Sequence, residues 1–303
     1  MTDPASRPKD GAETGDGLVA PVTTEAQSVK VSRAGRNLPA AVSVGASLGA
    51  AVIITLFVVP KWSFVVLATA CVCVGVWELC RALEAGGFNV PVVPSLVGCV
   101  SMVAAAYVGG GQALTVCFAL TCLAILVWRV ADGVTGAARD VMGGAVVAAY
   151  PSLLASFSSL LLAPSDGSWR LFTYVALTVA SDIGGYAVGV LAGRHPLAPT
   201  ISPKKSWEGF AGSVVACMIV GAVCVHFPLH GSWWVGALVG AVAAVAATAG
   251  DLIESTIKRD LGIKDMSNIL PGHGGLMDRL DSLVMTAPVV WALLVVLVPV
   301  GGG

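Results

Sequence analysis

Residues 255–281 read STIKRDLGIKDMSNILPGHGGLMDRLD, and they join two long apolar runs at 233–257 and 276–299. They hold four Lys or Arg side chains, one His and four carboxylates, whereas only 12% of the whole chain is charged. Ionisable side chains are costly inside a bilayer and mark functional sites there. A charged cluster between apolar runs therefore predicts a reaction centre at a membrane surface, with carboxylates for metal ions and cations for phosphate.

The composition excludes an ordinary soluble domain. The chain has 303 residues and is 56% hydrophobic, with a mean hydropathy of +0.85. Soluble domains carry about 25% charged residues, and roughly 20 apolar residues cross a bilayer as a helix. We therefore expect an all-α integral membrane protein. Its eight cysteines lie in apolar segments without a CxxC pair, which predicts small buried side chains rather than disulfides or a zinc site.

Nine apolar segments are long enough to be transmembrane helices. They cover residues 38–59, 62–83, 91–109, 112–130, 141–163, 169–192, 207–227, 233–257 and 276–299. Residues 1–37 are rich in Pro, Gly, Ser, Thr and charge, so they predict a disordered tail. We accordingly divide the chain into a disordered cytoplasmic tail (1–37), N-terminal transmembrane helices (38–165) and a C-terminal transmembrane catalytic region (166–303).

The Lys and Arg residues predict the orientation of these spans. If the N-terminus is cytoplasmic, 15 of the 17 Lys and Arg residues fall on the cytoplasmic side, and only Lys61 and Arg170 fall outside. The positive-inside rule therefore favours a cytoplasmic N-terminus and a C-terminus outside. Both long polar loops, 193–206 and 258–275, then lie on the cytoplasmic face. The expected location is the cell (inner) membrane, as a multi-pass protein whose active site faces the cytoplasm.

Paired carboxylates predict a metal site. Asp251 and Glu254 are three residues apart near the end of one span, and Asp278 and Asp281 are three apart at the start of the next, so each pair shares a helix face. Acids on facing helices repel one another, and Mg²⁺ relieves that repulsion because it binds carboxylates together with substrate phosphates. We predict Asp251, Asp278 and Asp281 as metal ligands. Asp182, an acid inside a span, is the candidate to complete the set.

Two other acids have predicted cationic partners. Glu254 precedes Lys258 by four residues, the favourable order for a helical ion pair. Glu78 precedes Arg81 by three residues, and we interpret it as half of a structural pair.

Two loops carry features typical of phosphate binding. Glycines in 271–275 bring backbone N–H groups close to an anion and lead into a helix N-terminus. His273 lies among them and is expected either to donate a hydrogen bond to a phosphate or to serve as a structural turn residue. In the other loop, Lys204 and Lys205 are compact charges suited to a polyphosphate. Ser206 is a predicted N-cap for the helix that follows.

The segment 255–281 resembles the signature of phosphatidate cytidylyltransferases (CDP-diacylglycerol synthases). The matching positions are Ser255, Lys258, Arg259, Lys264, Asp265, Ser267, His273, Gly274, Gly275, Asp278, Arg279 and Asp281. Residues 197–209 are similar to the family's L-A-P-x-I-S-P-K-K-[TS]-W-E-G loop, and 182–189 to its D-x-x-A-Y-x-x-G segment. There the chain departs at Gly185, where Ala is usual, and at Val190, where a basic residue is common. The resemblance covers residues 180–285.

The resemblance implies a reaction in which CTP and phosphatidate give CDP-diacylglycerol and pyrophosphate, with Mg²⁺ at two cation sites. It also implies a homodimer, and no nucleic-acid partner is expected. The residues expected in catalysis are Lys258, Arg259, Lys264, Asp265, His273 and Arg279. Those expected to bind substrate are Ser202, Lys204, Lys205 and Ser255.

Two other functions remain open. A transferase for another lipid phosphate or a polyprenol would use the same metal chemistry, because the apolar spans carry no readable code for the acceptor. A transporter of an anionic solute would place its polar residues near the membrane midplane, often in repeated helices. Here the charges crowd at span ends, only Asp182 lies deeper, and no inverted repeat is evident.

Overall fold

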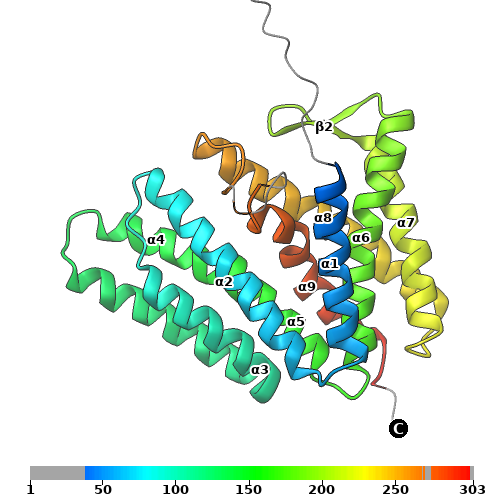
Figure 1. Cartoon of the computed structure of the whole chain (residues 1–303), viewed down its shortest axis with the longest axis horizontal. Coiled ribbons are helices and arrows are strands. Elements are labelled where there is room, and N and C mark those ends of the chain that lie inside the picture. Colours follow the sequence, from blue (N-terminus) through cyan, green and yellow to red (C-terminus); the bar gives the residue numbers. More distant parts are fainter. Residues whose placement is uncertain (1–37, 268, 270–273, 301–303) are drawn as a thin grey trace, which may run out of the picture. The chain divides into compact units, whose positions relative to one another are not determined.

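The computed structural model describes residues 38–267, 269 and 274–300, with side chains from residue 45 onward. The predicted disordered tail at 1–37 lies outside the described residues. The described chain is built from helices and one short hairpin (Figure 1). All eight cysteines are free and at least partly buried, as predicted.

Seven helical segments in the described part of the chain are long and apolar enough to cross a membrane. The chain is therefore a multi-pass membrane protein. The segments are α2 (Trp62–Ala85), α3 (Val92–Ala131), the composite Ala137–Leu162, α6 (Gly167–Ala192), α7 (Trp207–His226), α8 (Trp233–Asp260) and α9 (Met277–Leu297). Helix α1 (Leu38–Phe57) precedes them, and its described apolar part, Gly45–Phe57, is shorter. The count of nine spans and their orientation stay predictions.

Helix α3 contains two of the predicted spans. Gly110 interrupts it with φ 67° and ψ −160°, a conformation that glycine alone adopts readily. The two halves pack directly against each other, because a Cβ atom on Gly98 would lie 2.2 Å from Cγ2 of Thr121. The chain thus bends sharply between the segments predicted at 91–109 and 112–130.

The segment predicted as one span at 141–163 is not a regular α-helix. It consists of α4 (Ala137–Val147), the π-helical turn η1 (Ala148–Leu153) and α5 (Leu154–Leu162). Pro151 lies inside η1 and has no N–H to donate to the preceding turn. The Ser152 hydroxyl compensates in part, since it donates to the Val147 carbonyl at 3.2 Å. The proline therefore explains the local widening of the helix.

Buried polar contacts fix α9 against α6. Tyr174 on α6 donates to the Leu283 carbonyl at 2.9 Å. Arg170, which is 1% exposed, donates to the carbonyls of Leu294 (3.0 Å) and Val298 (2.8 Å) at the end of α9. The Val298 carbonyl lies at the C-terminal end of α9, where helix carbonyls lack a partner within the helix, so Arg170 provides a donor there. Helix α9 also packs against α8, α5 and α2, so it lies at the centre of the contacts among the described helices.

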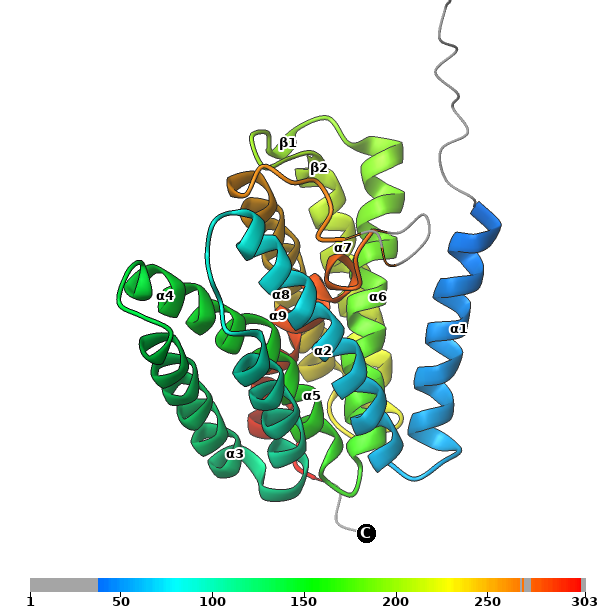
Figure 2. The same ribbon diagram turned by 60° about the vertical axis from the view of Figure 1, so that its left-hand side comes forward.

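The polar loop predicted at 193–206 contains a hairpin that the sequence did not predict. Strands β1 (Pro196–Ala198) and β2 (Ser202–Ser206) pair antiparallel, with Pro196 opposite Ser206 and Ala198 opposite Ser202. Glu208 in the first turn of α7 ties the hairpin down, since it pairs with His195 Nδ1 at 2.6 Å and accepts the Arg194 N–H at 3.0 Å. Figure 2 shows the hairpin at the end of the helices where α6 ends and α7 begins.

Candidate active site

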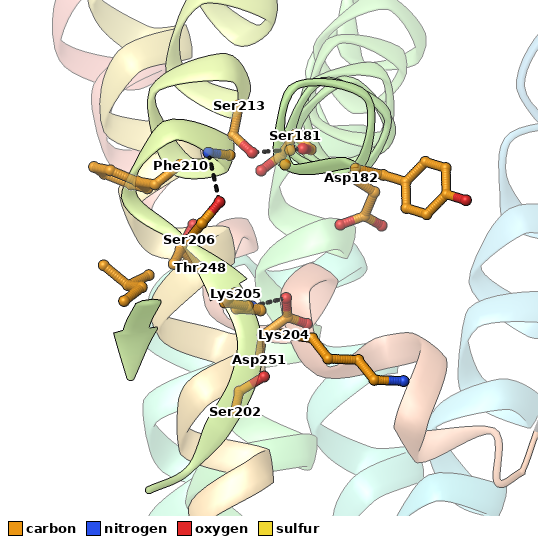
Figure 3. Close-up of a pocket in the computed structure, with 15 residues that line it drawn as sticks. Ser181, Asp182, Ser202, Lys204, Lys205, Ser206, Phe210, Ser213, Thr248 and Asp251 are labelled. Carbon is orange, nitrogen blue, oxygen red and sulfur yellow. Dashed lines mark hydrogen bonds and ion pairs between the residues drawn. The ribbon is translucent and has the colours of Figure 1, made fainter. Parts of the chain in front are cut away.

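A cavity of about 330 Å³ opens between the hairpin and helices α6, α7 and α8. Five predicted site residues line it: Asp182, Ser202, Lys204, Lys205 and Asp251. Figure 3 shows Asp182 on one wall and the Lys205–Asp251 pair across from it. Ser206 caps α7 as predicted, because its hydroxyl accepts the Gly209 N–H at 3.1 Å. The cap fixes where β2 ends and α7 begins.

Lys205 and Asp251 form an ion pair in this cavity. The Lys205 Nζ atom donates to Oδ2 of Asp251, and the Ser282 hydroxyl donates to Oδ1 at 2.9 Å. Asp182 lies within electrostatic range of Asp251, Lys205 and Arg279. The hairpin, α6, α8 and α9 therefore each contribute a charged side chain to one site.

A second group of acids lies where α8 meets α9. Asp281 interacts with both Asp251 and Glu254. The Ser282 hydroxyl lies between Asp251 and Asp281, 2.9 Å from one carboxylate and 3.2 Å from the other, so the two acids share its single proton. Sequence reasoning missed Ser282, because its role depends on how α8 and α9 pack rather than on local spacing.

Glu254 completes this group of acids. Its side chain is fully buried, and its Oε1 atom has no hydrogen-bond partner among the described residues. The other oxygen, Oε2, accepts from Lys258 Nζ at 3.2 Å, which confirms the predicted helical pair. A buried carboxylate oxygen without a partner is costly. The sequence predicted Glu254 among the acids on facing helices and as the partner of Lys258, but it did not predict Glu254 as a metal ligand.

The donor set at α8 and α9 fits a divalent cation in its chemistry. Mg²⁺ prefers carboxylate oxygens, and Asp251, Glu254 and Asp281 supply them, one as an unpaired buried atom. Lys205 and Ser282 engage Asp251. Across the described residues, no three His, Cys, Asp or Glu side chains are already arranged as metal ligands.

Asp278 is surrounded by donors. Its Oδ1 atom pairs with Lys258 Nζ at 2.7 Å, and its Oδ2 atom accepts the N–H groups of Gly275 (2.7 Å) and Met266 (3.0 Å). Its side chain is 6% exposed. The Asp278 carboxylate thus binds two backbone N–H groups of the loop between α8 and α9, and it also binds the Lys258 side chain.

The other predicted site residues lie around this centre. Arg259, Lys264 and Asp265 are exposed, and Ser255 is partly buried on α8. None of these four lines the cavity. The predicted role of His273 lies outside the described residues.

The predicted pair of Glu78 with Arg81 is wrong. Arg81 pairs with Glu84 instead, at 2.6 Å on the surface. Glu78 is fully buried and accepts hydrogen bonds from Ser267, Leu276 and Met277. An acid inside an apolar span indicates a functional site by itself. The sequence analysis did not treat Glu78 in this way, because Arg81 three residues later offered a simpler partner.

Known proteins resemble this chain over most of its length. The cytidylyltransferase family matches residues 40–297. The chain belongs to this family. It is therefore an enzyme, a cytidylyltransferase, and the family resemblance inferred from the sequence is confirmed.

Individual proteins are also similar to the chain, two of them over most of its length and one over less than half. A phosphatidate cytidylyltransferase from Mycobacterium leprae is 42% identical over 288 residues, covering 89% of this chain and 92% of the relative. One of the same name from Mycobacterium bovis is 39% identical over 307 residues, covering 97% and 96%. A third from Synechocystis sp. is 44% identical over 123 residues, covering 40% and 41%.

Proposed function

We propose that this cytidylyltransferase transfers the cytidylyl group of CTP to phosphatidate, giving CDP-diacylglycerol and pyrophosphate. The relatives that match nearly the whole chain bear the name phosphatidate cytidylyltransferase. The observation that carries the proposal is the Asp251 carboxylate, which meets a hairpin lysine on one oxygen and an α9 serine on the other. Cations for phosphate and acids for metal thus meet at one place.

The reaction needs charge neutralisation more than proton transfer. A phosphate oxygen of the lipid attacks the α-phosphorus of CTP, and the bond from that phosphorus to the bridging β-phosphate oxygen breaks. Both reactants are anions, so cations must screen them before they approach. Lys204 and Lys205 line the cavity, and Arg279 is within electrostatic range of Asp182 in its wall. The lipid phosphate is already an anionic nucleophile, so no strong general base is required.

Further residues are assigned to the same reaction. Ser202 and Ser255 bind substrate, while Lys258, Arg259, Lys264, Asp265 and His273 support the catalytic step. Lys258 acts while paired to Glu254 and Asp278. Arg259, Lys264 and Asp265 are exposed, where an incoming nucleotide reaches them.

Magnesium is the proposed cofactor. Asp251 and Asp281 would hold it, with Asp182 and Asp278 as the further ligands predicted from the sequence and Glu254 as the ligand suggested by its unpaired oxygen. When bound, two such cations would neutralise phosphate charge and polarise phosphorus–oxygen bonds.

The proposal places this site on the cytoplasmic face of the cell membrane, in a homodimer. A cytoplasmic site has access to CTP and to inner-leaflet lipid, and the Lys and Arg distribution favours that orientation. Cross-linking of the purified protein in detergent is expected to give a dimer, and a purely monomeric protein would contradict that part.

A direct assay tests the reaction. Purified protein in detergent micelles is incubated with α-labelled CTP, phosphatidate and Mg²⁺, and label is followed into the lipid phase. Incorporation that needs both phosphatidate and Mg²⁺ is expected. If folded protein labels another lipid phosphate or a polyprenyl phosphate but not phosphatidate, the acceptor is wrong. If it labels none of them, the transfer itself is wrong.

A further inference from the structure

Glu78 connects the N-terminal helices to the loop between α8 and α9. It lies on α2 and is fully buried. Its Oε1 atom accepts from the Ser267 hydroxyl and from the Leu276 N–H at 3.0 Å, and its Oε2 atom accepts the Met277 N–H at 2.7 Å. Ser267 and Leu276 lie on opposite sides of residues 268–275. One carboxylate therefore joins the two described ends of the loop.

Asp278 joins the same two ends of the loop through backbone N–H groups. Its Oδ2 atom accepts the N–H of Met266, before residues 268–275, and the N–H of Gly275, at their end. Lys258 balances the charge of Asp278. Glu78 has its two backbone donors in the first residues of α9, where the helix dipole favours a negative charge.

Gly275 shows how closely the two carboxylates approach the loop. A Cβ atom on Gly275 would lie 2.9 and 3.0 Å from the two Glu78 oxygens and 3.0 Å from Oδ2 of Asp278. Any side chain at this position would push at least one carboxylate away. The glycine is thus required by the two acids around it, independently of any phosphate.

We propose that Glu78 is a positioning residue that, together with Asp278, clasps this loop and sets the start of α9. The start of α9 carries Arg279, Asp281 and Ser282, and the Ser282 hydroxyl contacts both Asp251 and Asp281, so the placement of this helix decides whether the acids of α8 and α9 meet. The inference rests on the proposed function only for the role of those residues in the reaction. It extends the catalytic geometry to α2, outside the 180–285 segment that carries the family signature.

A purely structural Glu78 would behave differently from a clasp. Loss of a buried hydrogen-bonded acid lowers the stability of any fold. Loss of a clasp also loosens the loop locally and lowers kcat in protein that is still folded, because small displacements of catalytic groups cost up to about 100-fold in rate. Local hydrogen exchange and the division of the effect between kcat and KM separate the two cases.

The test compares Glu78→Gln with Asp140→Asn in the full-length enzyme. Gln keeps the volume but offers one acceptor oxygen instead of two, so one arm of the clasp is lost. Asp140 is a matched control: it is 4% exposed and accepts from Arg129 Nε (2.7 Å) and the Asn89 N–H (2.8 Å), away from the loop. Both variants are expected to have a lower Tm. Only Glu78→Gln should show faster amide exchange at 261–267 and 274–280 and a kcat about 10- to 100-fold lower with KM for CTP little changed.

The outcomes separate the clasp from the proposed reaction. Wild-type exchange and kcat in folded Glu78→Gln would overturn the clasp, as would equal losses of kcat in the two variants. If Glu78→Gln does not fold, Ser267→Ala removes the hydroxyl arm of the clasp, together with the bond that this hydroxyl accepts from the Ile269 N–H at 3.2 Å. Unchanged exchange at 261–267 in that variant also overturns the clasp. If the wild-type enzyme does not use phosphatidate, the proposed reaction fails while the exchange comparison still decides the clasp.

Discussion

Lys258 in the last turns of α8 and Asp278 in the first turn of α9 form a 2.7 Å ion pair that joins the two helices at the candidate site. The same Nζ atom reaches Glu254 Oε2 at 3.2 Å. Glu254 is 0% exposed and Asp278 is 6% exposed, so one cation balances two buried acids. Breaking a buried pair by removing one partner costs about 3–5 kcal/mol, because the remaining charge is left uncompensated.

Lys258→Met should therefore lower the free energy of unfolding by about 3–5 kcal/mol and abolish turnover. Thermal unfolding in detergent and the CTP incorporation assay measure the two effects. Arg81→Gln is the matched control, because it breaks an ion pair whose side chains are 59% and 60% exposed. Exposed pairs contribute little, so its Tm should not change. A Lys258→Met protein with wild-type Tm would show that the buried acids do not need this cation.

Asp281→Asn should leave the protein folded and abolish turnover. Asp281 interacts repulsively with Asp251 and Glu254, so removal of its charge should make the metal-free protein at least as stable as the wild type. Mg²⁺ should raise the Tm of the wild type, since a ligand that binds only the folded state stabilises it, and this rise should be lost in the variant. Thermal unfolding with added Mg²⁺ or a chelator provides the measurement.

Asp260→Asn controls for the loss of a negative charge from the neighbouring helix α8. Asp260 is exposed at the end of α8, so its variant should keep both activity and the Mg²⁺-dependent rise in Tm. Near-wild-type turnover in Asp281→Asn would remove Asp281 from the metal site, whatever the behaviour of the control.

Local spacing made part of this site predictable. Ser206 as a helix cap, and Glu254 with Lys258 four residues later, follow from contacts within one or two turns. Asp182, Lys204, Lys205 and Asp251 meet at one cavity, but the sequence indicated them through composition and a motif rather than through geometry.

The parts that sequence reasoning missed depend on distant residues or on unusual backbone. Glu78 binds partners 189 to 199 residues away, so no periodicity in α2 reports them. The contact of Ser282 with Asp251 depends on how α8 and α9 pack against each other, which the local sequence does not report. The hairpin at 196–206 lacks the apolar–polar alternation typical of a strand. The π-helical turn at Pro151 lies within an apolar run that otherwise reads as a regular transmembrane helix.

The orientation can be tested with single cysteines in a cysteine-free background. Thr135 and Ser232 are both exposed in loops. The Lys and Arg distribution predicts that Thr135 is cytoplasmic and Ser232 is outside. In intact cells an impermeant maleimide should label Ser232→Cys, whereas Thr135→Cys should be labelled only after permeabilisation. The reverse labelling pattern would show that the orientation is opposite to the predicted one. Labelling of both cysteines from outside would show that the predicted number of spans is wrong.

Lys204 and Lys205 are neighbours in sequence with different expected effects. The Lys205 side chain is paired with Asp251, whereas that of Lys204 is exposed and points away from this pair (Figure 3). Lys204→Met should leave the Tm unchanged and raise KM for CTP about tenfold, the size of one charge-assisted contact. The increase should shrink at high ionic strength, because salt screens an exposed charge.

Lys205→Met should affect stability as well. Without its lysine, Asp251 faces Asp281 and Glu254 with less compensation, so the metal-free Tm should fall and added Mg²⁺ should restore part of it. Arg81→Gln removes a cation from the same predicted face of the membrane and should leave KM for CTP unchanged. Equal KM values for Lys204→Met and the wild type at low salt would remove Lys204 from nucleotide binding. A metal-independent Tm in Lys205→Met would separate Lys205 from the metal site.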